Sequence, residues 1–330
     1  MATAVYERKP VRSSLVWWLR WAGILAFVLI LFVQLPRSQQ AQLTRMDLRW
    51  LGLCMLLTIG QLLLEALAWH SLLSTQRIRH PYPKTLLVYL ASQYLGLVTP
   101  GHVGEFLAAG YISQETGITF GYALSSVVVK KALAWLTIIG FGVFWGVPLL
   151  ADVTVRHGVK EMSIVTAVII VVLAGGITLW VFSLRQLARK WQRLSPWQID
   201  MEEFWAGMRH LGSPALAFPL VLTAGAFVVL FFQLDAVLKA IGVSLPFLLV
   251  SRIMALSRIA ARLMPVSGFG VGTKDAAIVI LLSQHGVEVP LGLTAVLLLL
   301  VCSYLVTLLL SGICWWVKPL VIRRAARPTS

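Results

Sequence analysis

The chain has 330 residues, of which 58% are hydrophobic and only 12% are charged, and its formal net charge is +15. A soluble domain of this size carries about 25% charged residues, so this composition excludes an ordinary soluble protein. Apolar runs of roughly 20 residues recur along the chain and predict transmembrane helices. The positive charge fits basic loops that orient such helices and face anionic lipid, and no motif of a nucleic-acid-binding module accompanies it.

Six apolar runs are long enough to be full transmembrane spans. They lie at about 15–35, 50–73, 131–150, 163–183, 214–240 and 289–317. No small-x-small cleavage site follows the first run, so a retained helix is expected there rather than a cleaved signal peptide. No polar stretch is long enough for a separate soluble domain, so residues 1–330 are expected to form one membrane domain with short basic tails.

Two further apolar regions, 86–112 and 246–286, are interrupted by turn-forming residues. The first is broken by the sequence TPGHVGE at 99–105, and the second by MPVSGFGVGTKD at 264–275. Each half is too short to cross the roughly 30 Å hydrocarbon core alone. Each break is therefore either a kink in one spanning helix or the tip of a re-entrant hairpin.

The distribution of basic residues favours the re-entrant alternative through the positive-inside rule. If both regions are re-entrant, most loop lysines and arginines fall on the side of the N-terminus, including those of the basic segment 184–193. If both regions span, this segment falls on the other side. A multi-pass protein of the cell inner (plasma) membrane with both termini in the cytoplasm is expected, although Arg37, Arg45 and Arg49 run against it.

Two amphipathic stretches, 117–130 and 198–212, are predicted to lie on the cytoplasmic leaflet as interfacial helices. Lys130 and Lys131 follow the apolar residues of the first stretch. These two lysines are expected to mark the cytoplasmic boundary of the next span, and membership of a functional site is the alternative.

The two broken regions resemble each other, which predicts an internal repeat with halves at about 50–183 and 214–317. Glu105 is followed eight and nine residues later by a Ser-Gln pair, and Asp275 is followed by the same pair at the same spacing. Two broken segments in corresponding halves, entering from opposite sides, are typical of inverted-repeat transporters.

Acidic side chains at membrane depth are costly and are therefore candidate functional residues. Glu105 either caps the second half-helix of its region or binds a coupling proton or cation, and Asp275 occupies the matching place. Glu65 and Asp235 lie inside predicted spans, so each is expected to pair with a buried base. His102 could titrate, but a lone histidine is more often structural.

The second broken region is rich in cations. Arg252, Arg258 and Arg262 precede the break, and Lys274 lies beside Asp275. Guanidinium groups match phosphate bidentately, so these four cations are predicted to hold a lipid phosphate. Snorkelling to the outer interface is the alternative for the arginines. Lys274 is not expected to pair with Asp275, because adjacent helical residues point about 100° apart.

The remaining residues of the two breaks are predicted to shape the site. Glycines allow close approach of the backbone to a ligand, and exposed N–H groups at a helix N-terminus favour an anion. The glycines assigned to substrate binding are Gly268, Gly270 and Gly272. The residues assigned to coupling or gating are Glu105, Asp275, Pro100, Gly101, Gly104 and Pro265.

These motifs resemble the transmembrane flippase-like domain associated with lysylphosphatidylglycerol synthases. That family carries a Pro-Gly-x-x-Gly-Glu break, here Pro100 to Glu105, and a second break ending Gly-Leu-Gly-Val-Arg-Glu or similar, here Gly270 to Asp275. His102 and Asp275 depart from the family pattern. Only 13 residues follow residue 317, so the soluble synthase domain of the family is not expected. The resemblance implies lipid translocation rather than aminoacyl transfer.

The sequence thus predicts an all-α integral membrane protein, a polytopic helical bundle with about six full spans and two broken or re-entrant hairpins. The predicted function is translocation of an anionic or phosphate-bearing lipid or a polyprenyl-linked glycan. A non-transporting partner or regulator and an enzyme acting on lipid phosphate are the alternatives. The dispersed histidines show no metal-ligand spacing, so neither metal nor cofactor is expected. A membrane lipid is the expected partner, nucleic acid is not, and a homodimer is left open.

Overall fold

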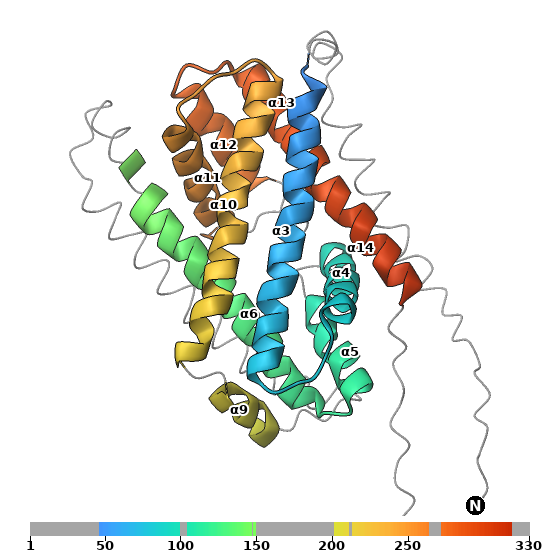
Figure 1. Cartoon of the computed structure of the whole chain (residues 1–330). Coiled ribbons are helices and arrows are strands. Elements are labelled where there is room, and N and C mark those ends of the chain that lie inside the picture. Colours follow the sequence, from blue (N-terminus) through green and yellow to red (C-terminus); the bar gives the residue numbers. More distant parts are fainter. Residues whose placement is uncertain are drawn as a thin grey trace, which may run out of the picture.

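The structure is a computed structural model that describes residues 46–99, 104–146, 148–149, 201–210, 213–263 and 272–318. These ranges consist of helices and the short turns between them, and they contain no strand (Figure 1). The predicted all-α class is therefore confirmed for the described part of the chain.

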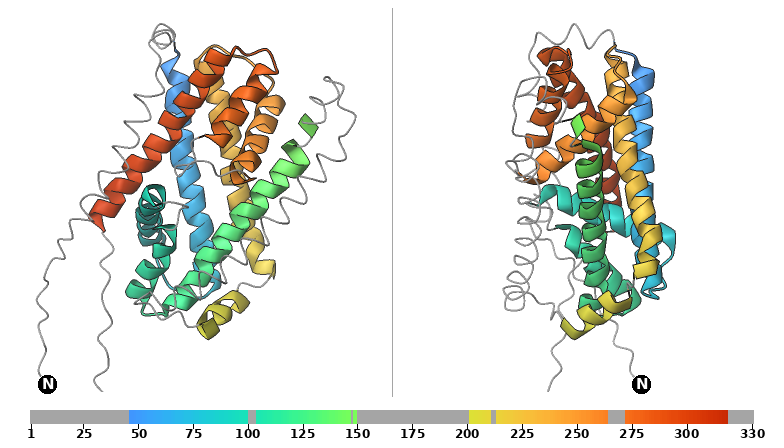
Figure 2. Two further views of the ribbon diagram at one scale, coloured as in Figure 1. Left: turned by 180° about the vertical axis from the view of Figure 1, so that it is seen from behind. Right: turned by 90° about the vertical axis from the view of Figure 1, so that its left-hand side faces the viewer.

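Two long antiparallel helices, α3 (Leu48–Thr75) and α10 (Ala217–Ala240), pack side by side and form one face of the described bundle; they are called the central pair, because the other described helices are arranged about them in Figure 1 (Figures 1 and 2). α3 begins where Asp47 accepts a hydrogen bond from the backbone N–H of Arg49 at 3.0 Å. The Asp47 N–H donates to the carbonyl oxygen of Ala240 at 3.1 Å, which joins the two helices at one end. The opposite end, where α9 (Met201–His210) lies, is called the α9 end.

Two pairs of shorter helices flank this central pair. They are α4 (Tyr82–Val98) with α5 (Leu107–Thr116), and α11 (Phe247–Leu263) with α12 (Thr273–Ser283). The α4–α5 pair lies toward the α9 end and the α11–α12 pair toward the opposite end (Figures 1 and 2). Both interrupted regions therefore form two helices each, as predicted.

Two helices that contain π-helical segments complete the bundle. α6 (Phe120–Phe141) continues into η3 (Gly142–Gly146). α13 (Val289–Leu299) continues through η5 (Leu300–Leu305) into α14 (Val306–Val317). With α3 and α10, these make four helices in the described part that are long and apolar enough to cross a membrane. The predicted spans at 15–35 and 163–183 lie outside the described residues, so the count of six stays a prediction.

Each pair of short helices, called a hairpin below, packs on a span from the other half of the chain. We call this arrangement exchanged packing. α4 packs along α14, where the rings of Tyr94 and Trp315 stack with centroids 5.3 Å apart. α11 packs against η3, at the end of α6. Two hydrophobic cores result, one around α4 and α5 and one around α10, α11 and α12.

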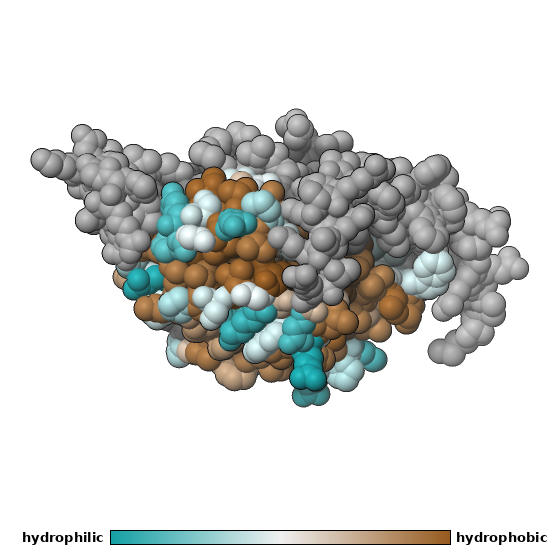
Figure 3. All heavy atoms as spheres, turned by 90° about the horizontal axis from the view of Figure 1, so that it is seen from above, coloured by the Kyte–Doolittle hydropathy of each residue, from teal (hydrophilic) through white to brown (hydrophobic). Residues whose placement is uncertain are grey.

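Large hydrophobic side chains are exposed along the spans. Examples are Leu56, Leu136, Val221 and Leu309, each at least half exposed. Seen from the end opposite α9, hydrophobic residues make up most of the described surface, with hydrophilic residues in patches between them (Figure 3). A monomeric soluble protein rarely exposes so much apolar area, whereas lipid covers it without cost.

The predicted interfacial helix at 117–130 is wrong. α6 begins at Phe120, after Thr119 caps it by accepting from the Tyr122 N–H, and continues without a break past Lys130 and Lys131. The candidate span is therefore Phe120–Gly146 rather than 131–150, and the two lysines lie within it instead of at its boundary. They are tolerated there because an acidic side chain of the first hairpin faces them. The second predicted amphipathic stretch, 198–212, does contain a helix, α9.

Candidate functional site

A row of polar side chains lies on one face of α3, inside the bundle. Thr58, Gln61 and Glu65 are three and four residues apart, so they share a face of the helix. The Gln61 amide donates to Glu65 Oε1 at 2.9 Å. From α10, the Gln233 amide donates to Gln61 Oε1 at 3.0 Å and to Thr58 Oγ1 at 3.2 Å. Because buried polar groups are costly without partners, this network is what allows them inside a span.

Tyr89 of α4 and Lys130 of α6 extend this row toward the first hairpin. The Tyr89 hydroxyl donates to Glu65 Oε2. Lys130 Nζ lies 4.7 Å from the centroid of the Tyr89 ring and 5.6 Å from that of Trp69, where the ring faces attract a cation. The Trp69 indole N–H donates to Ser126 Oγ at 3.1 Å. Side chains of three helices thus meet around one buried ammonium group.

Glu105 connects the first hairpin to α6 by an ion pair. Its Oε2 lies 2.7 Å from Lys131 Nζ and 3.9 Å from Lys130 Nζ. The exposed fractions of the three side chains are 8% for Glu105, 21% for Lys131 and 12% for Lys130. Removing such charges from water costs several kcal/mol per ion, so each needs its partner to remain charged there. One carboxylate therefore serves two lysines at membrane depth.

The turn that precedes α5 positions this carboxylate. The N-cap of α5 is Phe106, which makes no side-chain capping hydrogen bond, and the Glu105 side chain reaches α6. A Cβ at Gly104 would overlap with the backbone of Leu95, so the missing side chain lets this turn approach α4. The Gly104 N–H donates to Thr99 Oγ1 at 2.7 Å, which fixes the turn.

The second hairpin carries its own acid at the start of α12. Asp275 Oδ2 accepts from the Gly272 N–H at 3.0 Å, the reach-back of a capping box. Its Oδ1 lies 3.2 Å from Lys274 Nζ, so the prediction that these two neighbours do not pair is wrong. The lysine stem is long and flexible enough to bring the ammonium group back across the helix surface. Arg258 of α11 lies within electrostatic range of Lys274.

The structure places only part of the predicted phosphate site. Arg252 and Arg258 are partly buried on α11. Of the other predicted site residues, those outside the described residues are Pro100, Gly101, His102, Pro265, Gly268 and Gly270. The side chain of Arg262 is also outside the described part.

Of the two acids inside the long spans, Asp235 differs from the prediction in its partner. Asp235 Oδ2 lies 2.8 Å from Lys239 Nζ, one turn later in α10, and the Lys239 side chain is 40% exposed. The expected buried base is therefore wrong for Asp235, which lies near the end of its helix. Glu65 accepts hydrogen bonds from Tyr89 and Gln61, and the buried ammonium group of Lys130 lies within electrostatic range of it. Among the described residues, no group of three His, Cys, Asp or Glu side chains could hold a metal ion.

Comparison with known proteins identifies the family. Residues 20–311 match the family described as Lysylphosphatidylglycerol synthase TM region. The chain belongs to this family. The match covers both hairpins, three of the candidate spans and most of the fourth, and it makes the chain a membrane protein of a family related to lipid handling. No curated protein and no solved structure matches the chain.

Sequence reasoning missed four residues of the polar row, namely Thr58, Gln61, Tyr89 and Gln233. Two of them could have been found from their spacing. Gln61 lies three residues after Thr58 and four before Glu65 in an otherwise apolar run, which places all three on one face of a helix. Tyr89 and Gln233 gave no signal, because a single tyrosine or glutamine in an apolar helix is common. Only the packing of α4 and α10 on α3 brings them into the row.

Proposed function

We propose that this protein moves a lipid with an anionic or phosphate-bearing headgroup, such as a polyprenyl-linked glycan, between the leaflets of the cell inner membrane. The observation that carries the proposal is the placement of buried charges at the inner ends of two half-length hairpins. Glu105, with Lys130 and Lys131, lies at the first, and Asp275, with Lys274 and nearby Arg258, lies at the second. Charges at such depth are costly and mark a path for a polar group.

An inverted repeat accounts for this placement. The α4–α5 pair begins and ends toward the α9 end of the bundle, and the α11–α12 pair toward the opposite end (Figure 1). A glycine with left-handed backbone follows each second helix: Gly117, with φ of 75°, comes directly after α5, and Gly286, with φ of 85°, comes shortly after α12. The exchanged packing of α4 on α14 and of α11 on η3 is what a two-fold relation between the halves requires. Hairpins that enter from opposite sides are typical of transporters with inverted repeats.

The cations suit a phosphate. Arginine and lysine bind phosphate oxygens by charge-assisted hydrogen bonds, and the guanidinium of Arg258 can do so with two parallel bonds. The carboxylates of Glu105 and Asp275 hold these cations while no lipid is present. A headgroup that enters would exchange carboxylate contacts for phosphate contacts, so the two hairpins could move relative to the central pair α3 and α10. In this arrangement both termini are cytoplasmic, and the α9 end faces the cytoplasm.

The proposal is tested by reconstituting the protein into vesicles that contain fluorescent phosphatidylglycerol and measuring how fast the inner-leaflet fraction becomes accessible to a membrane-impermeant quencher. We expect faster exchange than in protein-free vesicles. We also expect at least a tenfold loss of rate in Lys131→Met and in the double variant Arg258→Ala, Arg262→Ala. The matched control is Lys239→Met, which removes a lysine from a more exposed ion pair near the end of α10.

Three results would contradict the proposal or part of it. Exchange no faster than in protein-free vesicles overturns lipid translocation. Unchanged rates in the Arg258 and Arg262 double variant remove the phosphate site from the second hairpin. A chemically altered phosphatidylglycerol after incubation indicates an enzyme instead, and mass spectrometry of the recovered lipid detects it.

A further inference from the structure

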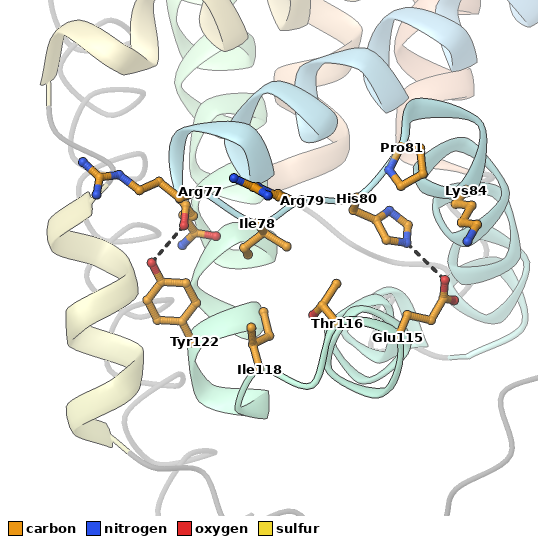
Figure 4. Close-up of a pocket in the computed structure, with 11 residues that line it drawn as sticks. Arg77, Ile78, Arg79, His80, Pro81, Lys84, Glu115, Thr116, Ile118 and Tyr122 are labelled. Atoms are coloured by element: carbon orange, nitrogen blue, oxygen red, sulfur yellow. Dashed lines mark hydrogen bonds and ion pairs between the residues drawn. The ribbon is translucent and has the colours of Figure 1, made fainter.

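A cavity of about 630 Å³ opens at the α9 end, apart from the buried charges of the two hairpins (Figure 4). Its lining comes from the loop between α3 and α4, the first turn of α4, the last turn of α5 and the beginning of α6. Ligand cavities in proteins are commonly between about 300 and 1,000 Å³, so this one has room for a small headgroup.

The lining of the cavity is rich in cations. Arg77, Arg79 and Lys84 are exposed at its wall, and none of them forms an ion pair with a described carboxylate. The one acid of the lining is Glu115, and it is already engaged: its Oε2 lies 3.1 Å from His80 Nε2, and its Oε1 pairs with Lys318. Within the described residues, the cavity therefore presents positive charge from Arg77 and Arg79 of the loop and from Lys84 of α4 that no ion pair balances.

The loop is held rigidly in place. His80 is buried, and its Nδ1 lies 2.8 Å from the Thr85 hydroxyl. The Tyr122 hydroxyl donates to the Gln76 carbonyl oxygen at 3.1 Å, and the Gln76 amide donates to Ser125 Oγ at 2.6 Å. A preformed loop that already orients its cations loses little entropy when an anion binds.

Arg77 sits in a backbone conformation that its side chain does not favour. Its φ is 59°, and it is the one residue other than glycine with positive φ in the described part of the chain. The Arg77 N–H donates to the Ser74 carbonyl, and the Ile78 N–H to that of Leu73, which together form a Schellman motif at the end of α3. Glycine is the usual residue at this left-handed position. An arginine at this position is unfavourable for folding, so the presence of arginine rather than glycine points to a role for its guanidinium group.

The position of the cavity relative to the membrane supplies that explanation. α3 ends at Thr75 and α6 begins at Phe120, and both are candidate spans, so the cavity lies where these spans reach the membrane surface. Lipid phosphates lie at this level, and clustered lysines and arginines there attract anionic lipids.

We propose that the cavity formed by Arg77, Arg79, His80 and Lys84 binds a phosphate-bearing anion, the headgroup of an anionic lipid or free phosphate. The guanidinium group of Arg79 provides forked donors for the phosphate oxygens, and Lys84 adds a point charge. The Arg77 side chain extends away from Lys84 (Figure 4), so it adds positive charge at the other side of the cavity. Glu115 keeps His80 in place at the back of the cavity. This proposal goes beyond the proposed function, because binding here requires no movement of lipid between leaflets.

The test measures binding to the full chain in a neutral maltoside detergent. The probes are dihexanoyl phosphatidylglycerol and inorganic phosphate, and dihexanoyl phosphatidylcholine is the zwitterionic comparison. We expect saturable, salt-sensitive binding of at least one anionic probe and at least tenfold weaker binding in Arg77→Gly and in Arg79→Gln. The control is Arg49→Gln, which removes an exposed arginine from the opposite end of α3.

Arg77→Gly also separates binding from folding. Glycine relieves the unfavourable backbone at this position, so the variant should unfold at the same temperature as the parent protein or at a higher one while it loses the anion. Preference for phosphatidylglycerol indicates a lipid headgroup, and binding of phosphate alone indicates a soluble anion; both support the proposal. Absence of binding by either probe, or parental affinity in both arginine variants, overturns it. Loss of lipid exchange with intact anion binding would contradict the proposed function alone.

Discussion

Lys131 Nζ lies 2.7 Å from Glu105 Oε2, and this contact joins the middle of a candidate span to the turn that precedes α5. Lys130 lies 3.9 Å from the same oxygen and approaches the Tyr89 ring instead. These adjacent residues of α6 thus share one carboxylate, and Lys130 also contacts an aromatic ring. The energetic role of this carboxylate can be separated from any role in lipid movement.

Glu105→Gln is expected to destabilise the protein by about 3–5 kcal/mol, because it leaves two buried ammonium groups without their counter-charge. Thermal unfolding in detergent, followed by tryptophan fluorescence, measures the loss. The matched control is Asp235→Asn, whose lysine partner is 40% exposed and whose pair should be worth less than about 1 kcal/mol. Equal losses in the two variants would show that burial does not govern the strength of these pairs.

Tyr89→Phe removes the hydroxyl donor to Glu65 and is expected to cost about 1–3 kcal/mol, since a buried acceptor loses its partner. Tyr82→Phe is the comparison: its hydroxyl donates to the Leu63 carbonyl oxygen at 3.2 Å at an exposed position, where water can replace it. Chemical unfolding of both variants in the same detergent gives the two free energies. A larger cost for Tyr82→Phe would contradict the importance of the polar row on α3.

Gly207→Ala is expected to loosen α9, because a Cβ at this position would overlap with the Ser125 side chain on α6. The Gly207 carbonyl oxygen also accepts from the Gln76 amide at 3.2 Å, and this contact should be lost. Hydrogen exchange of the amides of α9 should accelerate by roughly tenfold, which corresponds to about 1.4 kcal/mol. Gly225→Ala, where nothing lies within 4 Å, should instead leave α9 unchanged and stabilise α10 by up to about 1 kcal/mol.

Stability should depend on pH through Glu115. Burial by itself raises the pKa of this carboxyl group, but hydrogen bonds and charge from Lys318 and His80 outweigh burial and lower its pKa. A group whose pKa is lowered by folding stabilises the protein above its unfolded pKa, about 4.3 for glutamate, and loses that contribution as pH falls through the folded value. The unfolding temperature should therefore fall below pH 5 more steeply in the parent protein than in Glu115→Gln. Parallel pH profiles would contradict this.

Much of the fold followed from apolar length alone. The predicted spans at 50–73, 214–240 and 289–317 agree with the observed helices, because a continuous apolar run of spanning length has few alternatives in a membrane. The start of α6 was misplaced for an instructive reason. A pair of lysines ordinarily ends a span, and only the packing of the first hairpin against α6, which supplies Glu105, makes an interior position tolerable.

The charged residues of the site could be predicted from the sequence, whereas its uncharged polar residues could not. Glu105 and Asp275 stood out, since acids in apolar regions are rare, and both make ion pairs at the inner ends of their hairpins. The contact between Lys274 and Asp275 was missed, because residue direction along a helix says little about where a long flexible side chain ends. Nothing in the sequence distinguishes the loop Arg77–Arg79 from other basic loops, since its backbone conformation is visible only in three dimensions.

The exchanged packing has a consequence for biosynthesis. α4 is among the first described helices to be made, yet the surface it rests on, α14, is near the end of the chain. Until α14 is made, the face of α4 that carries Tyr94 lacks the helix on which it packs. Early in synthesis α4 and α5 are therefore incompletely packed. Contacts so distant in sequence form slowly. A chain truncated just before α14 should therefore be subject to quality control, although only a small part of its length is missing.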